Sequence, residues 1–246
     1  LGQNNETSYS SPRQVPGTTW SKISMAGIHG AAIRTDGTMW TWGSNAYGAL
    51  GLSQAHPWKY SSPVQVPGTD WSDILVSSNN YTACCMKALK TNGTLWAWGR
   101  QHFGALGTNE AGVDRSSPTQ IPGTWSSLPK NNGWSRTNSV QAAINTDGEL
   151  FTWGGNDQGG LGQNNNTYRS SPVQIGGSWS SVSSGQYGGA AIRTDGTLWT
   201  WGINSYGPLG LNSEGTNFSS PKQVGTAADW TFATMGYYSV GSQKLS

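Results

Sequence analysis

The feature that most constrains this chain is a thirteen-residue segment that occurs four times. Each copy has an apolar stretch, an Asp-Gly or Asn-Gly pair, and an alternating stretch ending in Trp-Gly; the copies are residues 31–43, 87–99, 142–154 and 190–202. In the last copy, Asp195-Gly196 predicts a two-residue hairpin turn, because glycine adopts the positive φ of such turns without a Cβ clash. Trp199 and Trp201 lie two positions apart, so their rings are expected on one face of a strand. Repetition of this kind predicts an array of similar units.

The surrounding sequence repeats as well, with a period of about 51–55 residues. A Leu-Gly pair and a Ser-Ser-Pro-x-Gln segment follow each hairpin, and an isolated Trp opens each new unit at positions 20, 71, 125, 179 and 230. Every unit therefore offers about four short strands, and Gly and Pro interrupt any helical period. Four-stranded units repeated at this period predict an all-β chain, a β-propeller. We expect residues 1–246 to form one array of four complete repeats with partial repeats at both ends, and to be a fragment of a longer chain.

Two stretches carry a resemblance to a known family. Residues 27–37 and 40–51 contain Gly, His, an apolar strand, Asp-Gly, Trp-x-Trp-Gly, Asn-x-x-Gly and Leu-Gly. This pattern resembles the repeat of the regulator of chromosome condensation family, whose members usually close a ring of seven blades. The resemblance implies that this chain is part of such a ring. The chain departs from the family pattern because it keeps the repeat histidine only as His29. The residues of its repeat, Trp-Thr-Trp-Gly and Ser-Ser-Pro-x-Gln, are similar to those of repeats in bacterial surface proteins and tailed-phage structural proteins.

Composition excludes several classes of partner. Charged residues are 11% of the chain and the net charge is +2, without the basic stripe that nucleic-acid binding needs. No apolar stretch approaches the roughly 20 residues that span a bilayer, so no membrane insertion is expected. Cys84 and Cys85 are adjacent, and we interpret them as free or buried thiols.

No catalytic constellation is visible in the sequence. His29, His56 and His102 have no partner at metal-ligand spacing, and neither a nucleophile elbow nor a phosphate-binding loop occurs. We therefore expect no enzyme activity, no cofactor and no metal, and a satisfied structural role for His29.

The tryptophans divide into two groups. Twelve of the fourteen stand at repeat positions, which predicts packing between blades. The expected core is built on Trp42, Trp98, Trp153 and Trp201. Only Trp58 and Trp134 lie outside the pattern, and these are candidates for exposed, functional aromatics.

Variation between the repeats points to a binding surface. The second and third units carry extra residues around positions 77–85 and 129–139, which include Tyr81 and Trp134. Equivalent insertions in a propeller project from one rim, although longer turns without a function would look the same. A second variable segment precedes each Ser-Ser-Pro. The candidate partner-binding residues are Trp134, Tyr81, Trp58, Tyr60, Arg115 and Arg169, of types enriched in binding hot spots.

The sequence favours a non-catalytic binding or structural module. We expect it on a phage particle, at the tail or capsid, or on a bacterial surface, where it engages a protein or glycan partner such as another virion protein. The expected location is the virion, the cell surface or the extracellular space. One alternative is a secreted inhibitor of a bacterial enzyme, which assays against hydrolases would distinguish. A third alternative, which the family name implies, is guanine-nucleotide exchange on a small GTPase.

Overall fold

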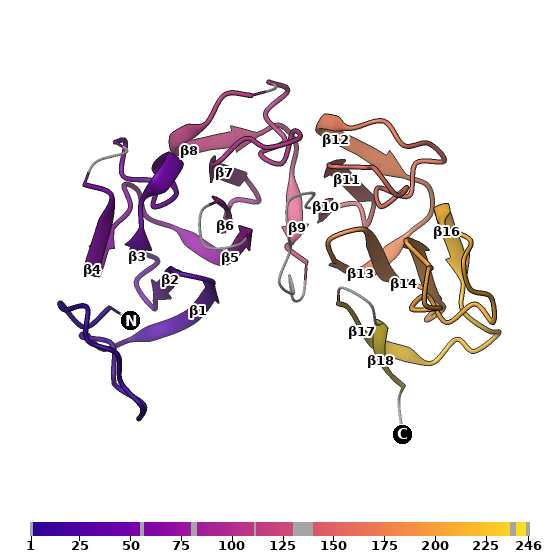
Figure 1. Ribbon diagram of the computed structural model, residues 1–246, viewed down its shortest axis with the longest axis horizontal. Helices are drawn as coiled ribbons and strands as arrows, with labels where there is room; N and C mark the ends of the chain where they lie inside the picture. Colours follow the sequence, from indigo (N-terminus) through magenta and orange to yellow (C-terminus); the bar gives the residue numbers. More distant parts are fainter. Residues whose placement is uncertain are drawn as a thin grey trace. The chain divides into compact units, whose positions relative to one another are not determined.

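The computed structural model describes residues 2–54, 57–79, 83–110, 112–129, 140–236 and 240–244. Within these residues the chain is all-β, with eighteen strands and one short 3-10 turn, η1 (Ala46–Gly48). The strands form four four-stranded sheets and one two-stranded sheet, and every pairing is antiparallel (Figure 1). The predicted propeller blades are therefore present.

Each four-stranded sheet takes its strands in chain order, so every blade is a simple meander. Blade 1 contains β1 (Trp20–Ala26), β2 (His29–Arg34), β3 (Met39–Ser44) and β4 (Lys59–Gln65). Blade 2 contains β5 (Trp71–Asn79), β6 (Ala83–Lys90), β7 (Leu95–Gly99) and β8 (Arg115–Ile121). Blade 3 contains β9 (Trp125–Ser127), β10 (Val140–Asn145), β11 (Leu150–Gly154) and β12 (Arg169–Ile175). Blade 4 contains β13 (Trp179–Ser184), β14 (Gly188–Arg193), β15 (Leu198–Gly202) and β16 (Phe218–Gln223). The two-stranded sheet pairs β17 (Trp230–Met235) with β18 (Val240–Lys244).

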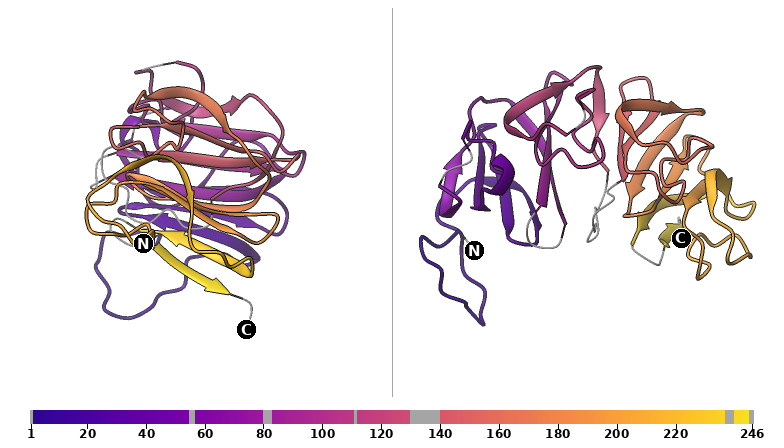
Figure 2. Two further views of the ribbon diagram at one scale, coloured as in Figure 1. Left: turned by 90° about the vertical axis from the view of Figure 1, so that its right-hand side faces the viewer. Right: turned by 45° about the horizontal axis from the view of Figure 1, so that its top comes forward.

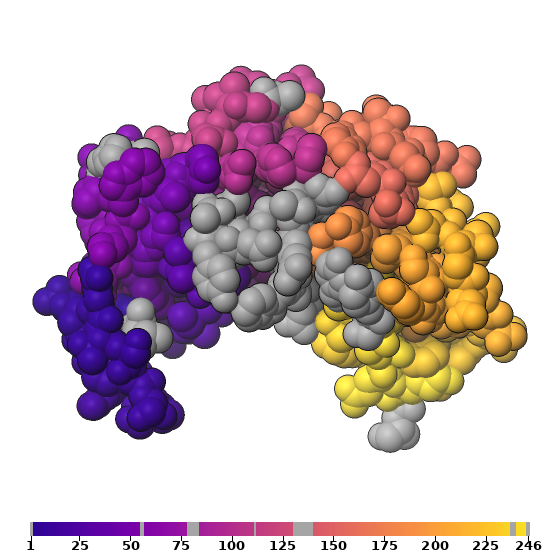
Figure 3. All heavy atoms as spheres, viewed as in Figure 1, coloured from indigo at the N-terminus to yellow at the C-terminus, as the bar shows by residue number. Residues whose placement is uncertain are grey.

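The chain divides into two compact units. Unit 1 comprises residues 1–101 and 113–122 and holds blades 1 and 2. Unit 2 comprises residues 102–112 and 123–246 and holds blades 3 and 4 with the two-stranded sheet. Within unit 1, the segment before β1 forms a long loop that extends away from blade 1 (Figure 2). Within unit 2, the two-stranded sheet, in yellow, lies against blade 4 (Figure 3).

The hairpin turn differs from the two-residue turn that the sequence predicts. In blade 4 the Arg193 N–H donates to the Thr197 carbonyl (3.0 Å) and the Gly196 N–H donates to the Arg193 carbonyl (3.0 Å). The loop therefore holds three residues, and only Gly196 has a positive φ, of 81°. This is the arrangement of a type I turn followed by a left-handed residue, which glycine favours.

A hydrogen-bonded relay explains why Asp-Gly-Thr-x-Trp is repeated. In blade 4, Asp195 Oδ1 accepts hydrogen bonds from Thr197 N (3.0 Å) and Thr197 Oγ1 (2.6 Å), and Thr197 Oγ1 accepts one from Trp199 Nε1 (2.9 Å). The guanidinium of Arg193 lies over the Trp199 ring, 3.9 Å from its centroid. The relay recurs in blades 1 and 2, with Asn92 in place of the aspartate in blade 2. A cation lies over the ring in both, Arg34 over Trp40 and Lys90 over Trp96. The turn is thus tied to the strand that follows it.

Blade 3 replaces three members of this relay together. Phe151 stands where the other blades have Trp, Glu149 stands at the Thr position, and Asn145 stands at the position of the cation. Glu149 now accepts hydrogen bonds from Asn145 Nδ2 (2.7 Å) and Gln174 Nε2 (2.9 Å). Because phenylalanine has no N–H to satisfy, the threonine hydroxyl is no longer needed there.

Four buried tryptophans occupy the same position on the third strand of each blade. Trp42, Trp98, Trp153 and Trp201 are each at most 1% exposed. Three of them donate a hydrogen bond from Nε1 to a backbone carbonyl of the preceding unit of the repeat: Trp98 to Ala49 (3.0 Å), Trp153 to Ala105 (3.1 Å) and Trp201 to Gly160 (2.8 Å). A Cβ added at Gly189 would lie 2.2 Å from the Trp201 ring, so a glycine is required beside it. The indoles of Trp98, Trp153 and Trp201 are therefore both packed and hydrogen-bonded by their neighbours.

The two ends of each blade differ in what they carry. At one end, here called the turn end, lie the Asp-Gly or Asn-Gly turn and the connection to the next blade; in blade 1 the Gly37 carbonyl accepts from the Trp71 N–H (3.1 Å). At the other end, the loop end, lie the turn between the first two strands and the loop between the third and fourth. The variable segment before each Ser-Ser-Pro falls in the loop between the third and fourth strands, at the loop end.

Candidate partner-binding surface

A buried asparagine anchors the loop at the loop end of three blades. In blade 1, Asn45 Nδ2 donates to the carbonyls of Gln54 (2.9 Å) and Pro57 (3.3 Å), and Asn45 Oδ1 accepts from the Leu50 N–H (3.1 Å). The Asn45 N–H also donates to the Trp58 carbonyl (2.6 Å). Asn156 and Asn204 make the corresponding contacts in blades 3 and 4. The variable loop is thus held by its backbone while its side chains are free to differ.

Large aromatic side chains are exposed at these loop ends. Tyr206 is 74% exposed and Trp58 is 59% exposed, and Tyr47 and Tyr168 are also exposed. Tyr47 and Phe103 occupy equivalent corner positions with φ of 58° and 51°, which is uncommon for bulky residues. A side chain held outward in this conformation by a tight corner is typical of a surface that makes contacts.

The exposed rings have neighbours within each unit. In unit 1 the Arg100 guanidinium lies 4.7 Å from the Tyr47 ring centroid. In unit 2 the Phe103 ring packs edge-on against Tyr168, with centroids 4.8 Å apart, and lies 3.9 Å from the His102 ring. These contacts reduce the freedom of the rings, so less entropy would be lost when a partner covers them.

A cavity of about 330 Å³ opens beside Trp58 at the loop end of blade 1. Trp58, Tyr60 and Ile28 supply apolar walls, and Lys59 pairs with Glu6 at its rim (Nζ to Oε1, 2.7 Å). Its volume is at the lower end of the range for ligand pockets. It has room for one or two side chains of a partner.

The residue before Ser-Ser-Pro occupies one position in all four blades. Tyr60, Arg115, Arg169 and Phe218 each pair with the glycine of Trp-Gly on the third strand. All four are half-buried, and Tyr60 packs against the core of unit 1. Arg169 Nε donates to Gln163 Oε1 (3.2 Å). In every blade a long side chain therefore stands on the fourth strand opposite the bare glycine of the third strand.

Two predicted binding residues, Tyr81 and Trp134, lie outside the described residues. The insertion that contains Tyr81 lengthens the hairpin of β5 and β6, whose pairing continues to Asn79 and Ala83. The insertion that contains Trp134 falls in the connection between β9 and β10.

Sequence reasoning missed Tyr47, Tyr168 and Tyr206. Tyr47 and Tyr206 precede the glycine of Asn-x-x-Gly, and Phe103 precedes the corresponding Gly104, so the signal was an aromatic at one repeat position. The regularity of that position favours a packing role, and only the structure shows the exposure.

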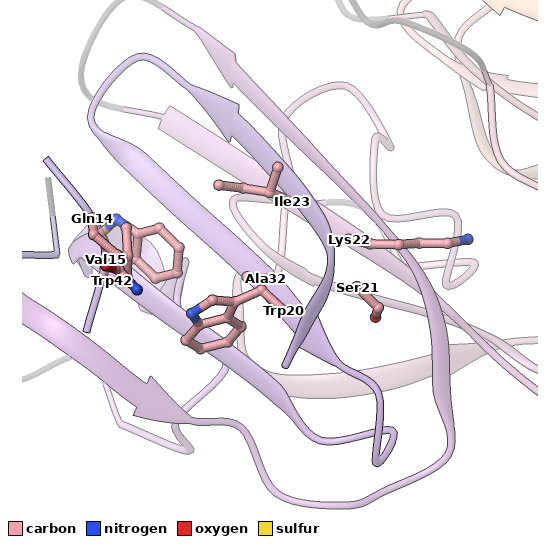
Figure 4. Close-up of a pocket in the computed structure, with 8 residues that line it drawn as sticks. All are labelled: Gln14, Val15, Trp20, Ser21, Lys22, Ile23, Ala32 and Trp42. Carbon is pink, nitrogen blue, oxygen red and sulfur yellow. The ribbon is translucent and has the colours of Figure 1, made fainter. Parts of the chain in front are cut away.

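A second hollow lies on the flank of blade 1 (Figure 4). It has a volume of about 270 Å³, and Trp20, Trp42 and Ile23 contribute to its walls. Ile23 is 62% exposed, whereas Ile74 at the same position of blade 2 is buried. Trp42 Nε1, unlike its three counterparts, has no acceptor among the described residues. The flank of blade 1 therefore leaves an isoleucine exposed that blade 2 buries, and a tryptophan N–H without the acceptor that its counterparts have.

The predicted structural role of His29 holds only in part. The side chain is buried and its ring interacts with the backbone of Ala26, but neither ring nitrogen makes a hydrogen bond of good geometry among the described residues, so the role is mainly packing. Burial lowers the pKa of His29 to about 4, because desolvation disfavours the imidazolium. Cys84 and Cys85 are free and buried, and burial raises the pKa of the Cys84 thiol. Among the described residues no group of three metal-ligating side chains occurs, and no helix has the length and apolar character that a bilayer crossing requires.

Four-stranded meanders, a tryptophan packed between blades and loops gathered at one end define a β-propeller repeat protein. The model of the regulator of chromosome condensation (RCC1) repeat matches residues 36–84, 92–142, 147–192 and 195–240. The chain belongs to the RCC1 repeat family. Each matched repeat begins in the hairpin turn of one blade and ends in the next, so it is offset from the structural blade.

Several characterised proteins share this sequence pattern. The Ultraviolet-B receptor UVR8 of Arabidopsis thaliana is 28% identical over 149 residues, which are 60% of this chain and 32% of that protein. The E3 ubiquitin-protein ligase HERC2 of Homo sapiens is 27% identical over 72% of this chain and 4% of its own length. The regulator of chromosome condensation of Xenopus laevis is 35% identical over 100 residues, which cover 40% of this chain and 21% of that protein. The chain spans about a third or less of these relatives.

Solved structures share the fold at low sequence identity. Prp20p from Saccharomyces cerevisiae superposes with a TM-score of 0.75 at 18% identity, covering 96% of this chain and 59% of that one. Human WBSCR16 gives a TM-score of 0.72 at 20% identity, covering 92% of this chain and 58% of that one. These similarities establish the propeller architecture.

Proposed function

We propose that this chain is a non-catalytic binding module that engages a protein partner through the loop ends of its blades. One observation carries the proposal: the sequence variation between repeats and the exposed aromatic rings occur at the same end of each blade. Aromatic residues supply large contact areas at low entropic cost and dominate binding hot spots. The turn ends repeat nearly the same residues and offer little that is specific to one partner.

The described relatives support a protein partner. The structure of Prp20p is described together with its binding to Gsp1p and histones, and another shows Kap60 bound to yeast RCC1. We extend only the class of partner to this chain. We propose the surface of a phage particle or a bacterial cell as the setting. This rests on the low charge of the chain and on the residues of its repeat. In that setting a glycan is a second possible ligand for the exposed tryptophan.

We also propose that the flank of blade 1 packs against a further blade of the same repeat, as part of a ring of seven. The support is internal to the chain. Val76 N–H donates to Ser24 Oγ across blades 1 and 2 (2.9 Å), and Met235 N–H donates to Ser183 Oγ in the same way (3.0 Å). Met25 holds the equivalent position in blade 1 and is 54% exposed. A further blade would cover it and bring a carbonyl to Trp42 Nε1.

Retention of partners on immobilised protein tests the binding function. The wild type and a variant with Trp58→Ser and Tyr206→Ser are each exposed to extract and medium of the source organism. We expect a protein that the wild type retains and the variant releases, with affinity lowered at least tenfold, as loss of two hot-spot residues implies.

The control is Thr194→Ala, an exposed position at the turn end of blade 4, which should retain the partner fully. Equal retention by all three proteins would contradict the proposal. Inhibition of hydrolases by the wild type would favour the inhibitor alternative, and nucleotide release from a small GTPase would favour the exchange alternative.

A further inference from the structure

The cavity beside Trp58 at the loop end of blade 1 combines an exposed aromatic ring with an ion pair. Its volume is about 330 Å³, and it is lined by residues 5–6, by Ile28 before β2, by the end of β3 and by residues 58–61 at the start of β4. All of these residues belong to unit 1 and lie at the same end of blade 1. β3 and β4 locate the site in Figure 1.

Backbone hydrogen bonds fix the two segments that carry the ring and the ion pair. The Asn4 N–H donates to the Ser61 carbonyl (2.8 Å), which holds the segment of Glu6 beside the start of β4. The Asn45 N–H donates to the Trp58 carbonyl (2.6 Å), which ties the other segment to the end of β3. The side chains of Glu6 and Lys59 then meet across the two segments (Oε1 to Nζ, 2.7 Å). The cavity is therefore formed before any ligand arrives.

The ion pair offers hydrogen-bonding groups of both kinds. The side chains of Lys59 and Glu6 are 65% and 68% exposed, and in the described part of the chain each pairs only with the other. The second carboxylate oxygen of Glu6 remains as an acceptor, and two N–H groups of Lys59 remain as donors. Neighbouring hydroxyl groups of a sugar both donate and accept, so they match this pair without requiring a net charge. An exposed ion pair contributes little to stability, so its rearrangement around a ligand costs little.

The apolar wall suits the other side of a sugar ring. Trp58 is 59% exposed and Ile28 is 46% exposed. The face of an aromatic ring carries partial negative charge, which attracts the weakly positive C–H groups that line one face of a hexopyranose. A hexopyranose is about as large as a large side chain, so the cavity has room for one ring.

The repeat does not demand this arrangement. In blade 2 the Asp114 carboxylate accepts from the Gln101 N–H (2.8 Å), whereas in blade 1 the Trp58 carbonyl accepts the equivalent bond. Lys59, at the place of Asp114, is therefore free to pair with Glu6. The residues at the place of Trp58 in the other blades are Val113, Thr167 and Thr216.

We propose that this cavity binds a neutral hexopyranose unit of a glycan, stacked on Trp58 with neighbouring hydroxyls at Glu6 and Lys59. This rests on the proposed binding function of the loop ends, and it names the ligand class of one of them. A peptide strand is disfavoured here, because the Ser61 carbonyl that it would pair with already accepts from Asn4. The neutral Glu6–Lys59 pair also gives a charged peptide no excess charge to bind.

NMR titration of the protein with small sugars tests the site. The probes are methyl β-galactoside, methyl β-glucoside and sorbitol, which has the hydroxyls without the ring face. The readouts are the indole N–H shift of Trp58 and saturation transfer from the protein to the sugar C–H protons. We expect saturable binding of at least one glycoside with a dissociation constant of about 1 mM, the scale for so small a ligand. Sorbitol should not saturate.

Two variants use residues that the repeat itself places at these positions. Trp58→Thr copies Thr167 of blade 3, and Glu6→Asn copies Asn166 at the equivalent place of the blade 3 loop, so both should fold. Trp58→Thr should weaken binding of the glycoside at least about tenfold, as loss of a hot-spot aromatic does. Glu6→Asn should weaken it at least about fivefold, through loss of a charged acceptor. The matched control is Tyr206→Ala, at the loop end of blade 4, which should leave the titration unchanged.

Several results would overturn the proposal. They are an absence of saturable binding of both glycosides, equal binding of sorbitol, unchanged binding by Glu6→Asn, or equal weakening by Tyr206→Ala. Retention of a protein by the wild type but not by Trp58→Thr, without sugar binding, would assign the cavity to a protein partner and leave the proposed binding function standing. Sugar binding without any retained protein would support the glycan site and contradict the protein partner.

Discussion

Single tryptophans serve two distinct roles in this chain, and their burial separates these roles. Trp201 is fully buried and donates to the Gly160 carbonyl, whereas Trp58 is largely exposed beside an open cavity. The sequence predicted which tryptophans pack, because repeat positions must face equivalent neighbours. It did not predict that Tyr47 and Tyr206, also at repeat positions, are exposed, because a repeat position by itself favours packing.

Replacing one tryptophan of each kind measures this difference. Trp201→Ala should lower the free energy of unfolding by about 3–5 kcal/mol, through the cavity it leaves and the hydrogen bond it removes. Trp58→Ala should change it by less than about 0.5 kcal/mol, as surface substitutions do. Urea unfolding of the three proteins checks both values. Equal losses would mean that Trp58 is part of the core.

His29 should make stability depend on pH. Its pKa is about 4 in the folded chain and 6.5 when exposed, so the unfolded chain binds the extra proton between these values. Its contribution to stability is therefore complete above pH 6.5, declines as the pH falls, and is lost by about 2 kcal/mol at pH 5. Below about pH 4 the loss stops growing.

The matched variant for this prediction is His29→Val, since Val140 holds the equivalent place in blade 3. Thermal unfolding from pH 7 to pH 4.5 should show a steeper decline for the wild type than for the variant. Parallel curves would show that His29 takes up its proton in the folded state as readily as in the unfolded one.

At the level of elements, each hairpin is stabilised by its own relay of side chains. The sequence located all four turns, because Asp-Gly and Asn-Gly are strong local signals. It misjudged their length, since two- and three-residue loops both place glycine at a positive φ, and the Arg193 to Thr197 bond decides between them. The coordinated changes in blade 3 show that the members of the relay depend on one another.

A double-mutant cycle tests this dependence. Thr197→Val should cost about 1–2 kcal/mol, because Trp199 Nε1 loses its acceptor while it is partly buried. Once Trp199→Phe is present, Thr197→Val should cost much less, as blade 3 already combines Phe with a non-threonine residue. Unfolding free energies of the four proteins give the coupling energy. Strictly additive losses would contradict the relay.

For the whole molecule, consecutive blades within each unit depend on contact between their flanks. Ile74 is buried where Ile23, at the same position of blade 1, is exposed. The sequence predicted blades and their order from the repeats alone. It could not show which flank is open, because the same apolar residues occur in covered and uncovered positions.

Serine substitutions compare the two flanks. Ile74→Ser should cost about 3 kcal/mol in this chain, as loss of a buried aliphatic side chain does, while Ile23→Ser should be nearly neutral. In a longer protein with a further blade on that side, Ile23→Ser should become as costly as Ile74→Ser. Circular dichroism with chemical unfolding measures the losses. A large cost for Ile23→Ser in this chain would show that its flank is already covered.

The central claim is that the loop ends of the blades bind the partner, whereas the turn ends only support the blades. Hydrogen–deuterium exchange with the retained partner tests this claim most directly. The account predicts slowed exchange in the loops at residues 45–54, 102–110, 163–168 and 203–217. It also predicts no change at the turns around residues 36–37, 92–93, 147–148 and 195–196. Protection confined to those turns, with the loops exchanging as before, would contradict it.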